Sequence, residues 1–224
     1  MIAGLDAPAF QTSPQFPPLG PGEVHLWSIR LDHAETEETA PLSPDEWLRA
    51  WRFHHTIDRE RYICAHSALR RILAGYVGEK ANVLTFKRNP HGKPELPGGL
   101  LRFNLSHSDD LMLLGVTHGR EIGVDVEKVR ENLPFEMLSD HYFPPEDQWS
   151  LRTTPSVQRL AKFFELWTRI EAQLKAHGSG LGETSEVLHP ERFTLRSFLP
   201  AEGYTAALAV EGRDFQLSCW QWLN

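Results

Sequence analysis

The stretch IGVDVE, residues 122–127, alternates three apolar residues with a glycine and two acids, Asp125 and Glu127. A period of two is typical of a β-strand, so we expect one apolar face and one face that carries both carboxylates. A third acid, Glu171, lies further along the chain. Carboxylates that project together repel each other, and Mg²⁺, which takes oxygen ligands, would relieve that repulsion. The set indicates a divalent-cation site, with a half-buried strand and a solvated acidic face as the alternative.

The strongest helix signal covers residues 155–177, where apolar residues recur at nearly the 3.6-residue period. Glu171 and Lys175 are four residues apart and therefore share one face of this helix. Lys175 is either a functional cation beside the acids or one partner of an ordinary ion pair. The run Gly178-Ser179-Gly180 is expected to end the helix.

The other elements follow from the same two periods and from turn signals. Ser43, followed by a proline and two acids, predicts a helix start, and Gly78 predicts the end of a long helix. Residues 88–94 form a turn-rich loop. The expected helices cover residues 44–53, 58–77, 133–142 and 155–177, and the expected strands cover residues 24–30, 101–106, 111–117, 121–127, 193–198, 204–210 and 215–222.

This order of elements predicts an α+β fold. We expect a pseudo-dimer of two similar α+β subdomains, each a small sheet packed with helices, although no clear sequence repeat relates them. Residues 1–22, rich in proline and polar residues, are expected to form an extended arm. The N-terminal subdomain would cover residues 23–115, and the C-terminal subdomain, with the three acids, residues 116–224.

Composition narrows the class of protein. The chain has 224 residues, 41% hydrophobic and 24% charged, which is ordinary for a globular protein. We expect no secretory signal and no membrane span. Cys64 and Cys219 match no metal-ligand spacing, so a reducing cytoplasm is expected. The net charge of −7 argues against general nucleic-acid binding.

The basic residues are concentrated in one segment. Residues 49–102 hold 11 Lys or Arg but only 4 acids. Such a segment could attract a polyanionic small molecule or an acidic protein partner. An ordinary mixed surface is the alternative, because the sequence does not show which charges cluster in space.

Five motifs in order resemble the Sfp-type 4′-phosphopantetheinyl transferases, over roughly residue 49 to the end. A single short motif would be weak, whereas five in order with matching spacing are specific. They are Arg70-Arg71-Ile72-Leu73; Gly92-Lys93-Pro94; Phe103-Asn104-Leu105-Ser106-His107-Ser108; residues 122–127; and Phe163 to Trp167, leading through Glu171-Ala172 and Lys175 to Gly178-Ser179-Gly180-Leu181.

The resemblance implies a Mg²⁺-dependent enzyme that transfers 4′-phosphopantetheine from coenzyme A to a serine of an apo acyl or peptidyl carrier protein. It implies a monomer with coenzyme A in the cleft between the two halves, and it leaves fatty-acid, polyketide and nonribosomal-peptide carriers open. Asp125, Glu127 and Glu171 would bind the metal. Asp125, Glu171 and Lys175 would be catalytic, and either Glu171 or a metal-bound water would take the serine proton. Coenzyme A would contact Arg52, Lys93, Pro94, Ser106, His107 and Lys175.

The chain departs from the family pattern at Ile170, where the family usually has a lysine before the glutamate. Arg169 could replace that charge, although neighbouring helix residues point about 100° apart. One alternative is therefore a catalytically weakened coenzyme A- or carrier-binding protein. Another is a different metal-dependent phosphoryl-transfer enzyme, against which the motifs at residues 92–94 and 104–107 argue.

Overall fold

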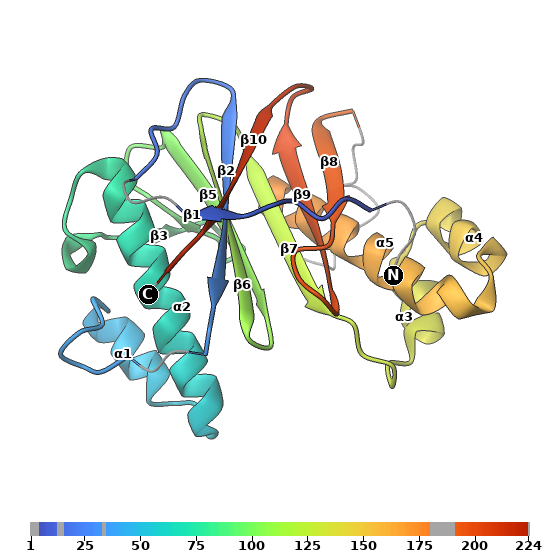
Figure 1. The fold of residues 1–224 in the computed structure, drawn as a ribbon, viewed down its shortest axis with the longest axis horizontal. Helices are drawn as coiled ribbons and strands as arrows, with labels where there is room; N and C mark the ends of the chain where they lie inside the picture. Colours follow the sequence, from blue (N-terminus) through green and yellow to red (C-terminus); the bar gives the residue numbers. More distant parts are fainter. Residues whose placement is uncertain (1–4, 13–15, 33–34, 180–190, 224) are drawn as a thin grey trace.

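The computed structural model describes residues 5–12, 16–32, 35–179 and 191–223, in which two halves of mixed α and β structure lie side by side (Figure 1). This confirms the predicted α+β class. Gly180 and Leu181 of the last motif lie outside the described residues. No helix in the described ranges combines the length and apolar character needed to cross a bilayer.

The N-terminal half is a five-stranded sheet in the order β1-β10-β2-β6-β5, packed against a long helix. The Ser43 side chain and Glu46 form a capping box at the start of α1, as the sequence predicts. The long helix α2 ends at Gly78, whose φ of 73° suits glycine. The elements of this half are β1 (Gln11–Thr12), β2 (Glu23–Arg30), α1 (Pro44–Ala50), α2 (Thr56–Val77), η1 (Ala81–Val83), β3 (Lys87–Arg88), β4 (Pro94–Glu95), β5 (Leu101–Ser108), β6 (Leu111–His118) and β10 (Gln216–Gln221).

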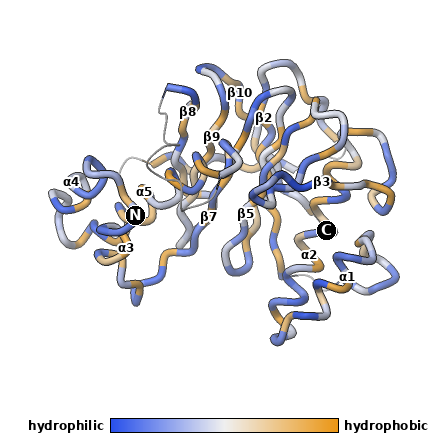
Figure 2. The backbone as a smooth tube through the Cα atoms, turned by 180° about the vertical axis from the view of Figure 1, so that it is seen from behind, coloured by the Kyte–Doolittle hydropathy of each residue, from blue (hydrophilic) through white to orange (hydrophobic). Residues whose placement is uncertain are grey.

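The C-terminal half is a three-stranded antiparallel sheet in the order β7-β9-β8, with α5 across one face. The helix α4 was not predicted from the sequence, because its residues are mostly polar and lack an apolar stripe. It lies at the outer end of this half and is largely hydrophilic (Figure 2). The elements are β7 (Ile122–Lys128), α3 (Phe135–Tyr142), α4 (Pro145–Thr153), α5 (Ser156–His177), β8 (Phe193–Phe198) and β9 (Tyr204–Glu211).

The apolar face of β7 joins the two halves. Val124 and Val126 are fully buried and pack in one cluster with Leu26 of β2 and Leu113 of β6. At about 25 cal/mol per Å² of buried apolar surface, this shared core is a major contribution to holding the sheets together. The opposite face of β7, which carries Asp125, is left facing α5.

The ends of the chain also connect the halves. The last strand, β10, pairs in parallel with β2 and so belongs to the sheet of the N-terminal half. Residues 5–12 of the arm run across both sheets, with Asp6 bridged to Phe198 and β1 paired with β10 (Figure 1). The subdomain boundary stays a proposal. The predicted boundary between residues 115 and 116 falls inside β6, which pairs with β5 along its whole length.

Candidate active site

The strands β5 and β7 are the neighbouring edges of the two sheets, and polar side chains join them. Asn104 accepts a hydrogen bond from the amide of Val124 at 2.8 Å. Two positions on, the Ser106 hydroxyl donates to Asp125 at 2.9 Å. Alternate residues of β5 therefore face β7, and the motif at residues 103–108 lies beside the two acids.

The helix α5 lies in close contact with the same face of β7. A side chain at Gly123 would place its Cβ atom 1.9 Å from the carbonyl oxygen of Ala172 and 2.4 Å from the amide nitrogen of Ala176. Only glycine fits there, since real Cβ contacts are never so short. This approach brings Glu171 and Lys175 of α5 to the acids of β7.

Asp125 is at the centre of the cluster and is only 2% exposed. The Lys175 ammonium donates to its Oδ1 atom at 2.6 Å and to the Ser106 hydroxyl at 3.0 Å. Among the described residues no donor reaches its Oδ2 atom, which is buried. The alternative of a solvated acidic face is therefore wrong for Asp125. A buried carboxylate oxygen without a partner is costly, which favours a ligand at this position.

The other two acids are partly buried beside Asp125. Burial raises the pKa of Glu171 above its usual value, the charges of Asp125 and Glu127 raise it further, and Lys175 opposes them. Burial also raises the pKa of Glu127, which accepts a hydrogen bond from Ser108 at 2.8 Å. The three carboxylates are thus close enough to interact electrostatically, as the sequence predicts.

These residues have the chemistry that Mg²⁺ requires, namely carboxylate oxygens with one buried oxygen free. Within the described residues, however, no three acidic, histidine or cysteine side chains are arranged to hold a metal ion. In this conformation Lys175 neutralises Asp125. The metal assignment of Asp125, Glu127 and Glu171 stays a prediction.

Positive charges surround His107, on the same strand as Ser106. His107 is exposed at the surface. Partial desolvation of its ring lowers its pKa, and the charges of Lys175, His66 and Arg61 lower it further. A group of cations beside a carboxylate cluster suits a phosphate-bearing ligand. His66 and Arg61 were not predicted as site residues, because no local pattern on α2 marks them, although the motif at residues 70–73 lies on the same helix.

Arg52 and Lys93, two of the residues predicted to contact coenzyme A, differ from each other in their surroundings. Arg52 is exposed in the turn after α1, and its side chain makes no hydrogen bond or ion pair within the described residues. The Lys93 ammonium donates to the carbonyl of Ile122 at 3.1 Å and to that of Ala176 at 3.5 Å. Burial lowers the pKa of Lys93. Lys93 thus fastens the loop that carries Pro94 to the start of β7 and the end of α5.

Acids form ion pairs with five of the 11 Lys and Arg residues of the basic segment. The Arg70 side chain is only 2% exposed and donates to Glu46 at 2.6 Å. Part of the positive charge of residues 49–102 is therefore neutralised within the protein. The segment's ion pairs in the described residues are Arg61–Asp109, Arg70–Glu46, Arg71–Glu35, Lys93–Glu121, Arg102–Glu95 and Arg102–Glu121.

Ile170 points away from the acids. It is 4% exposed and packs with Phe143 and Phe163 in the core between α5 and the preceding helices. Arg169 likewise faces α4, where its charge acts on Asp147. The helix α5 runs without interruption through Ile170. Neither residue supplies a charge to the acid cluster in this conformation.

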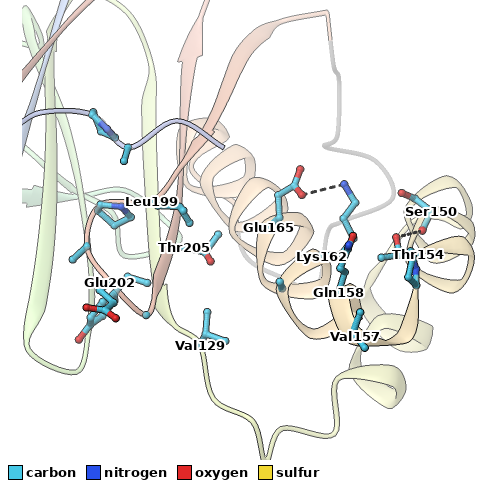
Figure 3. A pocket seen from close by; sticks show the side chains of 18 of the residues that line it. Val129, Ser150, Thr154, Val157, Gln158, Lys162, Glu165, Leu199, Glu202 and Thr205 are labelled. Atoms are coloured by element: carbon cyan, nitrogen blue, oxygen red, sulfur yellow. Dashed lines mark hydrogen bonds and ion pairs between the residues drawn. The ribbon is translucent and has the colours of Figure 1, made fainter. Parts of the chain in front are cut away.

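A cavity of about 1130 Å³ lies beyond the N-terminal half of α5, against the turn between β8 and β9 (Figure 3). None of the predicted site residues lines it. Its polar wall includes Lys162 and Glu165, which pair with each other at 3.1 Å. Thr205, also in the wall, faces Glu127 across the ladder of β7 and β9. The cavity therefore adjoins the acid cluster without containing it.

Together, the acids, the lysine and the neighbouring basic side chains form a cluster with the chemistry to bind a phosphate-bearing ligand. The comparisons with known proteins agree. The model of the 4′-phosphopantetheinyl transferase superfamily matches residues 121–220. The chain belongs to the 4′-phosphopantetheinyl transferase superfamily.

Several relatives resemble the chain over most of its length. The 4′-phosphopantetheinyl transferase HetI of Nostoc sp. is 37% identical over 220 residues, which cover 89% of this chain and 92% of the relative. A putative 4′-phosphopantetheinyl transferase of Synechocystis sp. is 33% identical over 74% of this chain and 69% of its own. The 4′-phosphopantetheinyl transferase of Bacillus subtilis is 26% identical over 80% and 76%.

Proposed function

We propose that this protein transfers the 4′-phosphopantetheine group of coenzyme A to a serine of an apo carrier protein and releases adenosine 3′,5′-bisphosphate. The observation that carries the proposal is Asp125, a buried carboxylate with a free oxygen, held by Lys175 and Ser106 where the two halves meet. Family membership supplies the substrate class.

The reaction is a displacement at phosphorus. The serine oxygen forms a bond to the pantetheine-bearing phosphorus of the pyrophosphate, and the bond from that phosphorus to the bridging oxygen breaks. The adenosine bisphosphate leaves with the electron pair. Either Glu171 or a water molecule beside it would accept the serine proton.

The side chains around Asp125 would hold and neutralise the donor. Asp125, Glu127 and Glu171 would hold Mg²⁺, which when bound neutralises charge on the pyrophosphate. Lys175, which donates to Ser106, and His107, whose pKa the charge of Lys175 lowers, would contact phosphate oxygens. Coenzyme A would then lie against β5 and α5, where it contacts both halves.

A catalytically weakened binding protein is not favoured. Ile170, which motivates that alternative, packs in the apolar core and leaves the three acids and Lys175 in place. The carrier protein, the monomeric state and a cytoplasmic location stay predictions from the family resemblance and the composition.

Mass spectrometry of carrier proteins tests the proposal. The protein is mixed with coenzyme A, Mg²⁺ and several apo carriers, and we expect one carrier to gain the mass of one phosphopantetheinyl group. Glu171→Gln should abolish the gain, whereas the matched control Glu165→Gln, six residues earlier on α5, should retain it. A protein that binds coenzyme A but modifies no carrier would overturn the proposal.

A further inference from the structure

The turn between β5 and β6 contains an unusual backbone conformation. Asp109 has a φ of 53°, and among the described residues it is the one non-glycine residue with a positive φ. Residues other than glycine are sterically strained in this region, although aspartate tolerates it better than most. Such conformations persist where the surroundings fix them, and they are concentrated at functional sites.

The surroundings of Asp109 join the two halves of the molecule. Its carboxylate accepts a hydrogen bond from Arg61 of α2, in the N-terminal half, and from Lys128 at the end of β7, in the C-terminal half. The turn itself belongs to the sheet of the N-terminal half. One strained aspartate thus holds two cations that come from opposite sides.

Asp110, the next residue, repeats this arrangement. Its carboxylate accepts from Arg30 at the end of β2 and from the Tyr204 hydroxyl at the start of β9. Each aspartate therefore bonds to one element of each half. We call Asp109 and Asp110 the aspartate turn.

The aspartate turn adjoins the candidate active site directly. Ser108, the residue before it, donates to Glu127 at 2.8 Å and accepts from the amide of Lys128 at 3.1 Å. Arg61, held by Asp109, is near enough to His107 for its charge to act on the imidazole. Arg61 thus lies near His107, and Lys128 directly follows Glu127 in the sequence, so both partners of Asp109 adjoin a residue of the candidate site.

Stability alone does not account for the strain. Asp109 and Arg61 are each 26% exposed and Lys128 is 42% exposed, and ion pairs of this exposure contribute little to folding. A glycine would adopt the turn without strain. The carboxylate, rather than the backbone, is what an aspartate adds at this position.

We propose that Asp109 is a positioning residue, which holds Arg61 of one half and Lys128 of the other and so fixes the spacing between the cations of α2 and Glu127 of β7. The inference rests on the proposed function, because coenzyme A is the proposed ligand whose phosphates these cations would bind. Asp109 itself need not touch the substrate.

Two variants separate position from stability. Asp109→Asn keeps tolerance of the left-handed conformation and removes the charge, and Asp109→Gly removes both charge and strain. We expect both to raise the KM for coenzyme A roughly tenfold, the cost of one misplaced charge-assisted hydrogen bond. The KM for the carrier should not change, and Asp109→Gly should melt no lower than the unchanged protein.

The control is Glu79→Gln, which removes one negative charge from an exposed position after α2 and should alter neither KM. An unchanged KM for coenzyme A in both aspartate variants, whatever their melting temperatures, would overturn the inference.

A second measurement does not depend on activity. If the unchanged protein modifies no carrier, the proposed function fails, and amide hydrogen exchange then tests the aspartate turn by itself. We expect faster exchange at residues 56–62 and 126–128 in both Asp109 variants, because α2 and β7 lose their common anchor. Exchange equal to that of Glu79→Gln in these two segments would show that Asp109 positions neither element.

Discussion

Replacing Lys175 by methionine should destabilise the protein when Mg²⁺ is absent. The Lys175 ammonium lies 2.6 Å from Oδ1 of Asp125, a carboxylate only 2% exposed. Methionine has a similar length but no charge. The variant would leave Asp125 buried with one remaining donor, the hydroxyl of Ser106.

The size of the effect follows from burial. Removing one partner of a fully buried ion pair costs about 3–5 kcal/mol. Lys175 is 30% exposed, so solvent screens part of the attraction, and Ser106 still donates to the carboxylate. We therefore expect a loss of about 2 kcal/mol. For a chain of this size, that loss corresponds to a fall in melting temperature of about 4–8 °C.

Magnesium should act differently on the two proteins. If Asp125 is a metal ligand, Mg²⁺ supplies the positive charge that the Lys175→Met variant lacks, and ligand binding stabilises the folded state. Addition of Mg²⁺ should therefore raise the melting temperature of Lys175→Met by more than it raises that of the unchanged protein. Differential scanning calorimetry at constant ionic strength measures both values.

The control is Lys162→Met, on the same helix, whose ammonium pairs with Glu165 and not with Asp125. It should lose less stability, and its response to Mg²⁺ should match that of the unchanged protein. The reasoning would be refuted if Lys175→Met melted at the temperature of the unchanged protein without Mg²⁺. An equal response of all three proteins to Mg²⁺ would refute the metal assignment of Asp125.

Three further predictions follow from buried positions. Ile170→Lys should lower the melting temperature without raising the transfer rate, because the lysine would enter an apolar core; a large rate increase would contradict the observed placement. Burial acts to raise the pKa of Glu46, but hydrogen bonds from His66 and other donors lower it from 4.5 to about 2. Glu46 therefore contributes up to about 3 kcal/mol of stability above pH 4.5, which is lost as the pH falls toward 2. Urea unfolding of Glu46→Gln should show a deficit at pH 7 that shrinks on acidification, and a pH-independent deficit would refute this sign. Gly123→Ala should force α5 off β7 and lower both melting temperature and activity, since its Cβ atom would overlap the Ala172 carbonyl; unchanged thermal unfolding would exclude the close approach.

The sequence was informative wherever a pattern is local. The period of two in residues 122–127 and the 3.6-residue period of α5 predict which residues share a face, and the structure brings those faces together. The partner of a strand is not encoded in its own period. The assignment of β10 to the sheet of β2 depends on contacts across nearly the whole chain, so the local pattern could not reveal it.

The motif on β5 contains a local signal for the position of this strand in the fold. Asn104, Ser106 and Ser108 alternate with apolar or aromatic neighbours in a strand that is mostly buried. A buried polar side chain needs a hydrogen-bond partner, and three on one strand face require a polar partner along the whole edge. In this chain the strand with regularly spaced acids is residues 122–127. The spacing of the three polar residues therefore predicts that β5 and β7 lie edge to edge. Ser106 and Ser108 then bond to the carboxylates of β7 before any ligand binds.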